Sequence, residues 1–288
     1  MDVLVTGATG FVGSRLVPAL LDTDHDVTVL VRDADGYDAP DGVRVVEGDL
    51  LEPGSFDAAL DVEAAYYLVH SMRSGADFEE RDRRAAANFA RAASESDVER
   101  VVYLGGLGED RDRRSEHLRS RREVERVLSE GGYDLTTLRA AILIGAGSAS
   151  FEMIRQLSSR LPVMVTPRWV DTKCQPIFVD DAIAYLVGVL SVPETAGETY
   201  EIGGPDVLTY REILLSVGEK RGRRPVVLPV PVLSTRLSSL WIGLVTDVPT
   251  AVARPLIDGL RNPVVVRDHR IESLVDVDLT PFDEAVDR

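Results

Sequence analysis

The chain has 288 residues, which is enough for one large α/β domain with an additional lobe. Its 48 acidic residues outnumber its 32 basic ones, and the net charge of −16 argues against a broad nucleic-acid contact. The single cysteine, Cys174, rules out an internal disulfide, and no uncharged apolar run approaches the roughly 18 residues that span a bilayer. We therefore expect a soluble, cytoplasmic protein.

The positive charge is almost entirely arginine, because Lys173 and Lys220 are the only lysines. An acidic surface with so little lysine resembles that of cytosolic proteins from salt-loving archaea. At about 1 M salt the Debye length is about 3 Å, so repulsion between acidic side chains is screened. The composition therefore predicts a fold that loosens in dilute buffer.

Residues 1–13 predict a short buried strand that runs into a glycine-rich turn and then an amphipathic helix. In a dinucleotide cradle the three glycines have separate roles. Gly7 permits the tight turn, Gly10 lets the backbone approach a pyrophosphate, and Gly13 lets the helix lie close to the sheet. The alternative is a glycine-lined turn without a ligand.

The first helix is expected to begin near Phe11, with free N–H groups and the positive end of its dipole facing the anion. The other predicted cradle residues are Thr9 and Val12. The spacing Gly-x-x-Gly-x-x-Gly resembles that of the short-chain dehydrogenase/reductase superfamily, particularly its extended and atypical members. This resemblance implies a Rossmann-type fold that binds a nicotinamide dinucleotide.

Residues 26–32 predict a second buried strand that ends at Arg32. In Rossmann-type folds an acid at this strand end binds the ribose of NAD, whereas a nearby arginine suits the 2′-phosphate of NADP. Arg15, early in the first helix, is a second candidate for that phosphate. NADP(H) is therefore favoured, although Asp33 keeps NAD(H) open, and two solvated arginines are the alternative.

Two further predicted strands, residues 43–48 and 64–71, end at the same edge of the sheet. The family resemblance implies that Asp49 and Leu50 contact the adenine, and a helix or turn cap is the alternative for Asp49. The residues expected at the end of the fourth strand are Val69, His70 and Ser71. For His70 we favour a backbone contact to the ribose over acid–base chemistry.

A long helix over about residues 76–95 and a fifth strand over residues 99–104 follow. In catalytic members of the superfamily a serine or threonine follows this strand, and a later helix carries Tyr-x-x-x-Lys on one face. Here Ser120-Arg121-x-x-x-Glu125 resembles the family's Ser-Lys-x-x-x-Glu and sets the register. His117 then stands at the tyrosine position, Arg121 at the lysine position, and glycines where the serine is expected.

This exchange of residues changes the chemistry that the helix can supply. Arg121 can hydrogen-bond a ribose, but it stays cationic and cannot relay a proton as lysine does. His117, with an ordinary pKa of about 6.5, is a candidate proton donor in place of the phenol. A surface helix of mixed charge with a solvated histidine is the alternative, so an ordinary carbonyl reduction is in doubt.

The second half of the chain is expected to carry the substrate site. A sixth strand in residues 133–145 leads to a loop of small residues in which Gly147 and Ser148 are substrate-binding candidates. A helix is expected over residues 151–159. Residues 161–176 should line the lobe. There Arg168 and Trp169 are candidates to bind an anionic or planar ligand, and the alternative is a packed tryptophan beside a surface arginine.

The remaining elements complete the sheet and the lobe. Residues 177–182 resemble the extended family's Val-Asp-Asp-Ala element, in which the acids start a helix, and residues 198–204 predict the last strand of the main sheet. Thr209 and Glu212 predict a capping box. The apolar stretch 237–245, with Trp241, is expected to pack in the core, with a partner or membrane surface as the alternative.

Taken together, these motifs resemble the YbjT-type atypical short-chain dehydrogenase/reductase family, related to NmrA-like regulators, sugar-nucleotide epimerases and the nucleotide-binding accessory subunit of respiratory complex I. The expected fold class is α/β, a Rossmann-type doubly wound parallel sheet with a smaller C-terminal substrate lobe. The expected division is a Rossmann NAD(P)-binding core over residues 1–145, an insertion into the substrate lobe over 146–175, a return to the core over 176–204, and a C-terminal substrate lobe over 205–288.

Three functions follow from the resemblance. The first is an atypical NAD(P)H-dependent oxidoreductase that acts on an unknown small molecule through His117 and Arg121. The second is a nucleotide-binding module without turnover, either a redox sensor or an accessory of a respiratory or membrane complex at the inner face of the membrane. A sugar-nucleotide epimerase ranks last, because that chemistry uses the tyrosine that this chain lacks. No metal site is predicted.

Overall fold

The computed structural model describes residues 1–71, 77–108, 116–230, 245–248, 257 and 259–288. Its centre is a seven-stranded sheet in the order β11-β6-β5-β4-β1-β2-β3, and every neighbouring pair is parallel. The strands are β1 (Asp2–Thr6), β2 (Asp26–Val31), β3 (Arg44–Glu47), β4 (Ala64–Tyr67), β5 (Arg100–Gly106), β6 (Asp134–Ala140) and β11 (Thr199–Ile202). The predicted Rossmann-type fold is confirmed. The strand order reverses between β1 and β4, where such sheets bind ligands.

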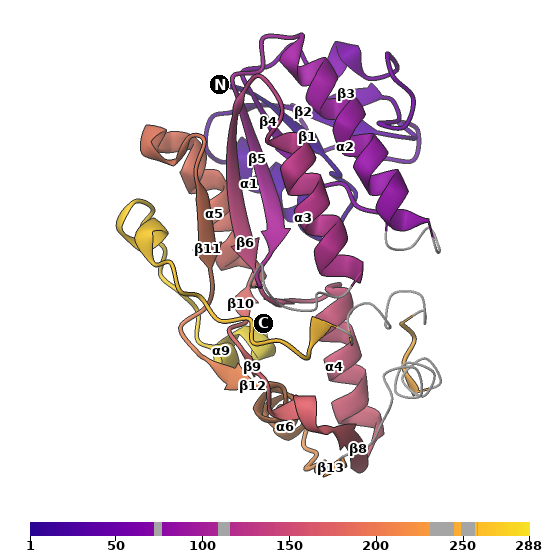
Figure 1. The fold of residues 1–288 in the computed structure, drawn as a ribbon, viewed down its shortest axis with the longest axis vertical. Coiled ribbons are helices and arrows are strands. Elements are labelled where there is room, and N and C mark those ends of the chain that lie inside the picture. The colour runs from indigo at the N-terminus through magenta and orange to yellow at the C-terminus, as the bar shows by residue number, and fades with distance from the viewer. Residues whose placement is uncertain (72–76, 109–115, 231–244, 249–256, 258) are drawn as a thin grey trace.

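Helices cover both faces of this sheet, as buried parallel strands require. Alternate residues of β1 point to opposite faces, so Val3 and Val5 join one apolar cluster and Leu4 joins the other. The first face is covered by α1 (Gly13–Leu21) and α5 (Val179–Ser191), and the second by α2 (Phe78–Ser94) and α3 (Glu116–Leu128) (Figure 1).

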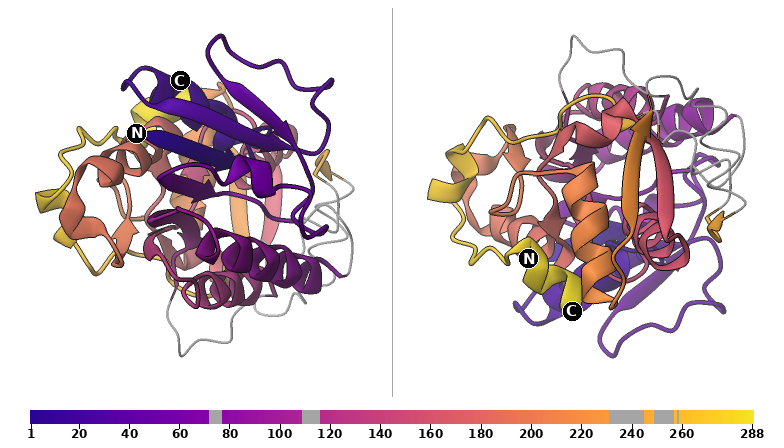
Figure 2. Two further views of the ribbon diagram at one scale, coloured as in Figure 1. Left: turned by 90° about the horizontal axis from the view of Figure 1, so that it is seen from above. Right: turned by 90° about the horizontal axis from the view of Figure 1, so that it is seen from below.

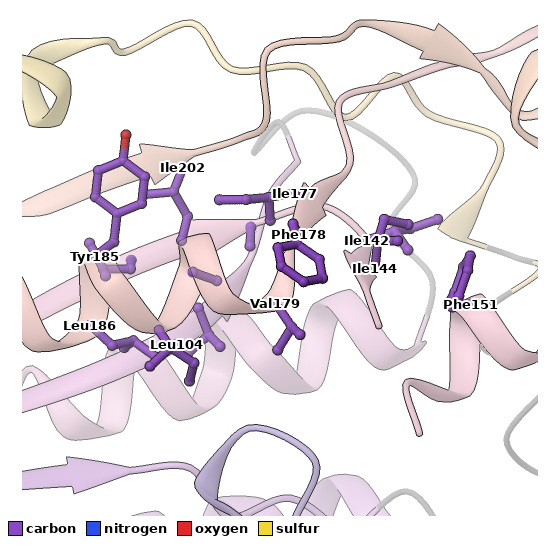
Figure 3. Close-up of a cluster of buried hydrophobic side chains, with 14 of the residues drawn as sticks. Leu104, Ile142, Ile144, Phe151, Ile177, Phe178, Val179, Tyr185, Leu186 and Ile202 are labelled. Atoms are coloured by element: carbon purple, nitrogen blue, oxygen red, sulfur yellow. The ribbon is translucent and has the colours of Figure 1, made fainter. Parts of the chain in front are cut away.

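A smaller lobe lies beyond the carboxyl ends of the strands (Figures 1 and 2). Its elements are α4 (Ala149–Arg160), β8 (Val163–Pro167), the 3-10 helix η3 (Arg168–Asp171), β9 (Lys173–Cys174), β12 (Leu208–Thr209), α6 (Tyr210–Lys220) and β13 (Val226–Val230). The short strands β7 (Leu143–Ile144) and β10 (Ile177–Phe178) pair where the chain leaves and re-enters the core. Figure 3 shows apolar side chains of this junction, including Ile144, Phe151 and Val179, so the lobe and the sheet share one buried cluster.

Residues 264–275 return along the core, whereas residues 282–287 are bonded to α6 of the lobe. Gln175 fastens this return, because its Nε2 donates to the Gly204 carbonyl at 2.8 Å and its Oε1 accepts from the Val266 amide at 3.0 Å. Val275 packs so closely that a Cβ on Gly188 of α5 would lie 2.3 Å from its Cγ1. The segment 264–275 therefore packs on the core, although the expected division placed all of residues 205–288 in the lobe. The division itself stays a prediction.

Element boundaries differ little from those expected. Helix α1 begins at Gly13 instead of near Phe11, and Val12 is its N-cap. Thr209 and Glu212 form the predicted capping box. The described residues also form the 3-10 helices η1 (Asp57–Ala59), η4 (Pro193–Thr195) and η5 (Arg270–Ser273) and the helix α9 (Phe282–Asp287). Most of the apolar stretch 237–245 lies outside the described residues. Among the helices described, none is long and apolar enough to cross a membrane.

Candidate functional site

The glycine-rich turn after β1 has a backbone path that two of its glycines impose. Gly7 has φ +74°, and a Cβ there would lie 2.9 Å from the Leu68 carbonyl oxygen of the neighbouring strand exit. A Cβ on Gly13 would lie 2.3 Å from the Gly7 oxygen, so a side chain there would push α1 off the turn. Gly13 thus brings the helix against the turn itself.

Gly10 has a different environment. A Cβ at this exposed position would meet a single atom within 4 Å, the Gly7 oxygen at 3.1 Å. The N-cap residue Val12 makes no side-chain cap, and in the described part of the chain the amides of Phe11 and Val12 donate no hydrogen bond. The open space beside Gly10 and the amides of Phe11 and Val12, which directly precede α1, fit a phosphate group. The residues of the turn therefore suit the pyrophosphate of a dinucleotide.

Arg15 ties the turn to the loop after β7. Its Nη1 donates to the Phe11 carbonyl and its Nη2 to the Ala146 carbonyl, both at 2.8 Å, and its guanidinium lies 4.6 Å from the centre of the Phe11 ring. The Phe11 ring in turn lies close to Gly145 and Gly147. The predicted cofactor residues and the predicted substrate loop are thus in direct contact. A phosphate contact by Arg15 stays a prediction.

Arg32 follows β2 directly, at the carboxyl edge of the sheet beside β1. Its side chain is exposed and makes no ion pair or hydrogen bond within the described residues. The neighbouring Asp33 accepts from the Gly36 amide at 3.1 Å and so stabilises the turn that follows. The cation at this strand end is therefore available to a ligand, while the acid has a local partner.

Asp49 and Leu50 follow β3. Asp49 Oδ1 accepts from the Leu51 amide at 2.9 Å, which is the turn cap named above as the alternative. Leu50 is buried, and its carbonyl accepts from Asn88 Nδ2 of α2 at 2.8 Å. Asn88 therefore holds the predicted adenine loop against α2. The adenine contact stays a prediction.

Val69, His70 and Ser71 follow β4, with His70 exposed. Ser71 interacts with Asp82, a carboxylate on the buried side of α2 that sequence reasoning missed. Asp82 is 3 % exposed, and its Oδ2 accepts from Ser120 Oγ of α3 at 3.2 Å. Burial raises the pKa of Asp82, against the opposing effects of Ser71, Arg121 and Ser120. The sequence signal for its burial was its position one helical turn after Phe78, in an otherwise apolar stripe.

Helix α3 carries the motif Ser120-Arg121-x-x-x-Glu125, and each motif residue has a contact. Arg121 Nη1 donates to the Leu104 carbonyl at 3.3 Å, so the guanidinium reaches the end of β5. Glu125 accepts from Arg139 Nε at 3.2 Å and from Arg122 Nη1 at 3.1 Å. The motif thus fixes α3 to α2 through Ser120 and to β6 through Glu125. The backbone of His117 lies in α3, but its side chain is outside the described part, so its catalytic role stays a prediction.

The predicted substrate residues lie in two places. Gly147 has φ +93°, and Ser148 is the N-cap of α4, with its buried Oγ accepting from the Phe151 amide at 3.4 Å. Arg168 is exposed at the start of η3, and the Trp169 side chain is outside the described part. A cap role leaves the Ser148 hydroxyl committed within the protein, and all four substrate contacts stay predictions.

Metal and thiol chemistry have no described site. No group of three metal-ligating side chains occurs among the described residues. Burial raises the pKa of the Cys174 thiol to about 12, so the thiolate needed for nucleophilic attack is scarce at neutral pH.

A parallel sheet with helices on both faces and an open glycine turn at its switch point defines a dinucleotide-binding protein. The family model described as NAD(P)H-binding matches residues 7–160, which is more than half of the chain. The chain belongs to this NAD(P)H-binding family.

Relatives agree with this assignment. The chain is 26% identical over 300 residues to the mitochondrial NADH dehydrogenase [ubiquinone] 1 alpha subcomplex subunit 9 of Arabidopsis thaliana, covering 96% of this chain and 73% of that one. It is 27% identical to the ceramide reductase of Caulobacter vibrioides, covering 80% and 73%. These matches confirm the resemblance stated from the motifs.

Solved structures share the fold. An NADPH-dependent quinone oxidoreductase from Escherichia coli matches with a TM-score of 0.80 at 20% identity, covering 99% of this chain and 98% of that one. A nucleoside-diphosphate-sugar epimerase from Staphylococcus aureus matches with a TM-score of 0.79 at 18% identity, covering 100% of both. At these identities the likeness concerns the fold alone.

Proposed function

We propose that the protein is an NAD(P)H-dependent oxidoreductase of an atypical kind that prefers NADP(H). The observation that carries the cofactor preference is the exposed Arg32 guanidinium, which lacks an internal partner in the described residues and stands at the strand end beside the open glycine turn. A 2′-phosphate supplies the negative charge that this cation lacks. Asp33, which opposes such a phosphate, is held in a turn by Gly36.

The chain's own residues divide the remaining work. A bound nicotinamide supplies a hydride to the substrate. The amides of Phe11 and Val12 bind the pyrophosphate, and Arg121, fixed beside the end of β5, donates to the nicotinamide ribose. His117, one turn before Arg121 on α3, delivers the proton that accompanies reduction. Relatives named as reductases support reduction as the reaction.

The test is a fluorescence titration with NADPH and NADH in molar salt. Arg32→Ala should weaken NADPH binding by roughly tenfold, as expected for loss of one charge-assisted hydrogen bond, and leave NADH binding nearly unchanged. Arg91→Ala, at an exposed position on α2, is the matched control. Equal losses for both nucleotides, or tighter binding of NADH by the wild type, would remove the NADP preference.

The second candidate is a nucleotide-binding accessory without turnover, associated peripherally with a respiratory or membrane complex. It is favoured by the match to a complex I subunit over 96% of this chain. Oxidation of bound NADPH by a panel of quinones and aldehydes, abolished in His117→Ala, supports the oxidoreductase. Nucleotide binding without turnover, together with capture of respiratory subunits from native membranes, supports the accessory. An epimerase ranks third, because its fold likeness is not accompanied by the catalytic tyrosine.

A further inference from the structure

The two-stranded sheet of β8 and β13, here called the ribbon, has one apolar face turned to solvent. Its strands are parallel and in register, with Val163 opposite Val226 and Val165 opposite Leu228. These four side chains are 47%, 51%, 52% and 48% exposed, respectively. The alternate residues Met164 and Val227 are buried, so the other face packs into the lobe.

Basic side chains border the ribbon, and three of them have no acidic partner within the described residues. Residues 160–171 and 211–230 hold seven basic and three acidic side chains. Asp247, Asp283 and Asp287, which bond Arg160, Ser216 and Lys220, bring three further acidic side chains to the same end of the lobe. Arg168, Arg221 and Arg223 are exposed and make no ion pair within the described residues. Arg160, Arg211, Lys220 and Arg224 pair with Asp247, Asp171, Asp287 and Glu219.

The position of the ribbon suits contact with a large surface. It lies at the end of the molecule farthest from the N-terminal part of the sheet (Figure 1), and it is turned toward the viewer when the molecule is seen from below (Figure 2). Basic side chains precede β13 in the run 220–224 and follow β8 at Arg168. Cations therefore stand at both ends of the apolar face.

We infer that the ribbon docks the protein on a lipid bilayer that carries anionic headgroups. Aliphatic side chains flanked by arginines match the two layers of such a surface, acyl chain below and phosphate above. A second copy fits less well. Stable protein interfaces bury roughly 800 Å² on each partner, and four half-exposed side chains on two five-residue strands offer only a fraction of that area.

Ionic strength separates the electrostatic contribution to membrane binding from the apolar one. At about 0.15 M salt the Debye length is about 8 Å, so Arg168, Arg221 and Arg223, unpaired within the described residues, attract anionic lipid close to the ribbon, while the repulsion from more distant carboxylates is screened. In molar salt this attraction is screened, and burial of the apolar side chains carries the binding. This inference concerns a surface remote from the glycine turn and does not depend on the nicotinamide chemistry.

The experiment is co-sedimentation of the full chain with phosphatidylcholine vesicles, with and without phosphatidylglycerol, at both salt concentrations. The wild type should bind the anionic vesicles more tightly, with the difference shrinking in molar salt. The double variant Val165→Asp/Leu228→Asp should lose binding by at least about tenfold at both salts. Arg221→Glu/Arg223→Glu should lose binding by a similar factor at low salt only.

Two exposed positions away from the ribbon provide matched controls. Val207→Asp, at a residue 43% exposed before β12, and Arg91→Glu on α2 should bind as the wild type does. Circular dichroism and NADPH binding verify that each variant is folded. Equal binding by the ribbon variants and the controls would overturn the inference, as would the absence of any binding to anionic vesicles. Pelleting without vesicles that the ribbon variants abolish would instead identify a second copy as the occupant and overturn it too.

Discussion

At the glycine turn the two backbone amides of Phe11 and Val12 have no acceptor within the described residues, whereas on α3 the motif side chains Ser120, Arg121 and Glu125 all bond other groups of the protein. Buried or helix-terminal polar groups are normally satisfied, so groups left open mark the place for a ligand. We propose that the open turn is the binding end of the site and that α3 is the scaffold that positions the chemistry.

The sharpest test of the binding end compares two glycines of the same turn. Gly13→Ala places a Cβ 2.3 Å from the Gly7 oxygen, so we expect a loss of about 3 kcal/mol or more in the free energy of unfolding. Gly10→Ala meets a single atom at 3.1 Å and should cost under about 1 kcal/mol. Urea unfolding monitored by circular dichroism measures both. Equal losses of unfolding free energy in the two variants would show that Gly10 is as closely surrounded as Gly13.

On the scaffold side, Glu125→Gln removes the charge shared by Arg122 and Arg139, whose side chains are only 12% and 22% exposed. Two part-buried guanidinium groups without their carboxylate should cost about 2 to 3 kcal/mol. Glu123→Gln on the same helix is the control, because its pair with Arg126 is exposed and should contribute under about 1 kcal/mol. Similar losses in the two variants would contradict a fixed α3.

Asp82 gives a pH-dependent test of the same scaffold. Because burial raises its folded pKa above the unfolded value of about 3.9, the folded state binds the extra proton. The stability linked to this proton is complete below the unfolded pKa and is lost as pH rises through the folded pKa. As pH rises through the folded pKa, the free energy of unfolding of Asp82→Asn should therefore increase relative to that of the wild type. Urea unfolding of both proteins from pH 3 to 8 measures this difference. A difference in unfolding free energy between the two proteins that does not change with pH would contradict a raised pKa for Asp82.

The response of the melting temperature to salt sums many small contributions. Each acidic side chain on the surface contributes less than any of the substitutions above. With a net charge of −16, the melting temperature should rise by several degrees between about 0.1 M and about 2 M sodium chloride, as repulsion is screened. Differential scanning calorimetry measures it. An unchanged melting temperature would mean that the acidic surface is not adapted to salt, and binding experiments would then not need molar salt.

The geometry of the glycine turn was largely predictable from sequence, and the contacts of the α3 scaffold were not. A glycine at fixed spacing between a strand and a helix has few physical explanations, so Gly7 and Gly13 could be assigned before the fold was known. Asp82 was missed because an acid on a charged helix usually faces water. Its place in the apolar stripe of α2 was a weak signal, and the packing of α2 against α3 shows that it is buried. The Arg15 bond to Ala146 joins residues 131 positions apart and has no local signal.

The central claim is that the open turn binds a nicotinamide dinucleotide, and the most direct measurement is a fluorescence titration of the wild type and Gly10→Ala with NADPH in molar salt. We expect saturable binding by the wild type and a loss of roughly tenfold or more in the variant, because its methyl group takes up open space in the turn where we expect the pyrophosphate to lie. The melting temperature without ligand should stay nearly the same. Equal affinity in both proteins, or no binding by a folded wild type, would contradict the claim.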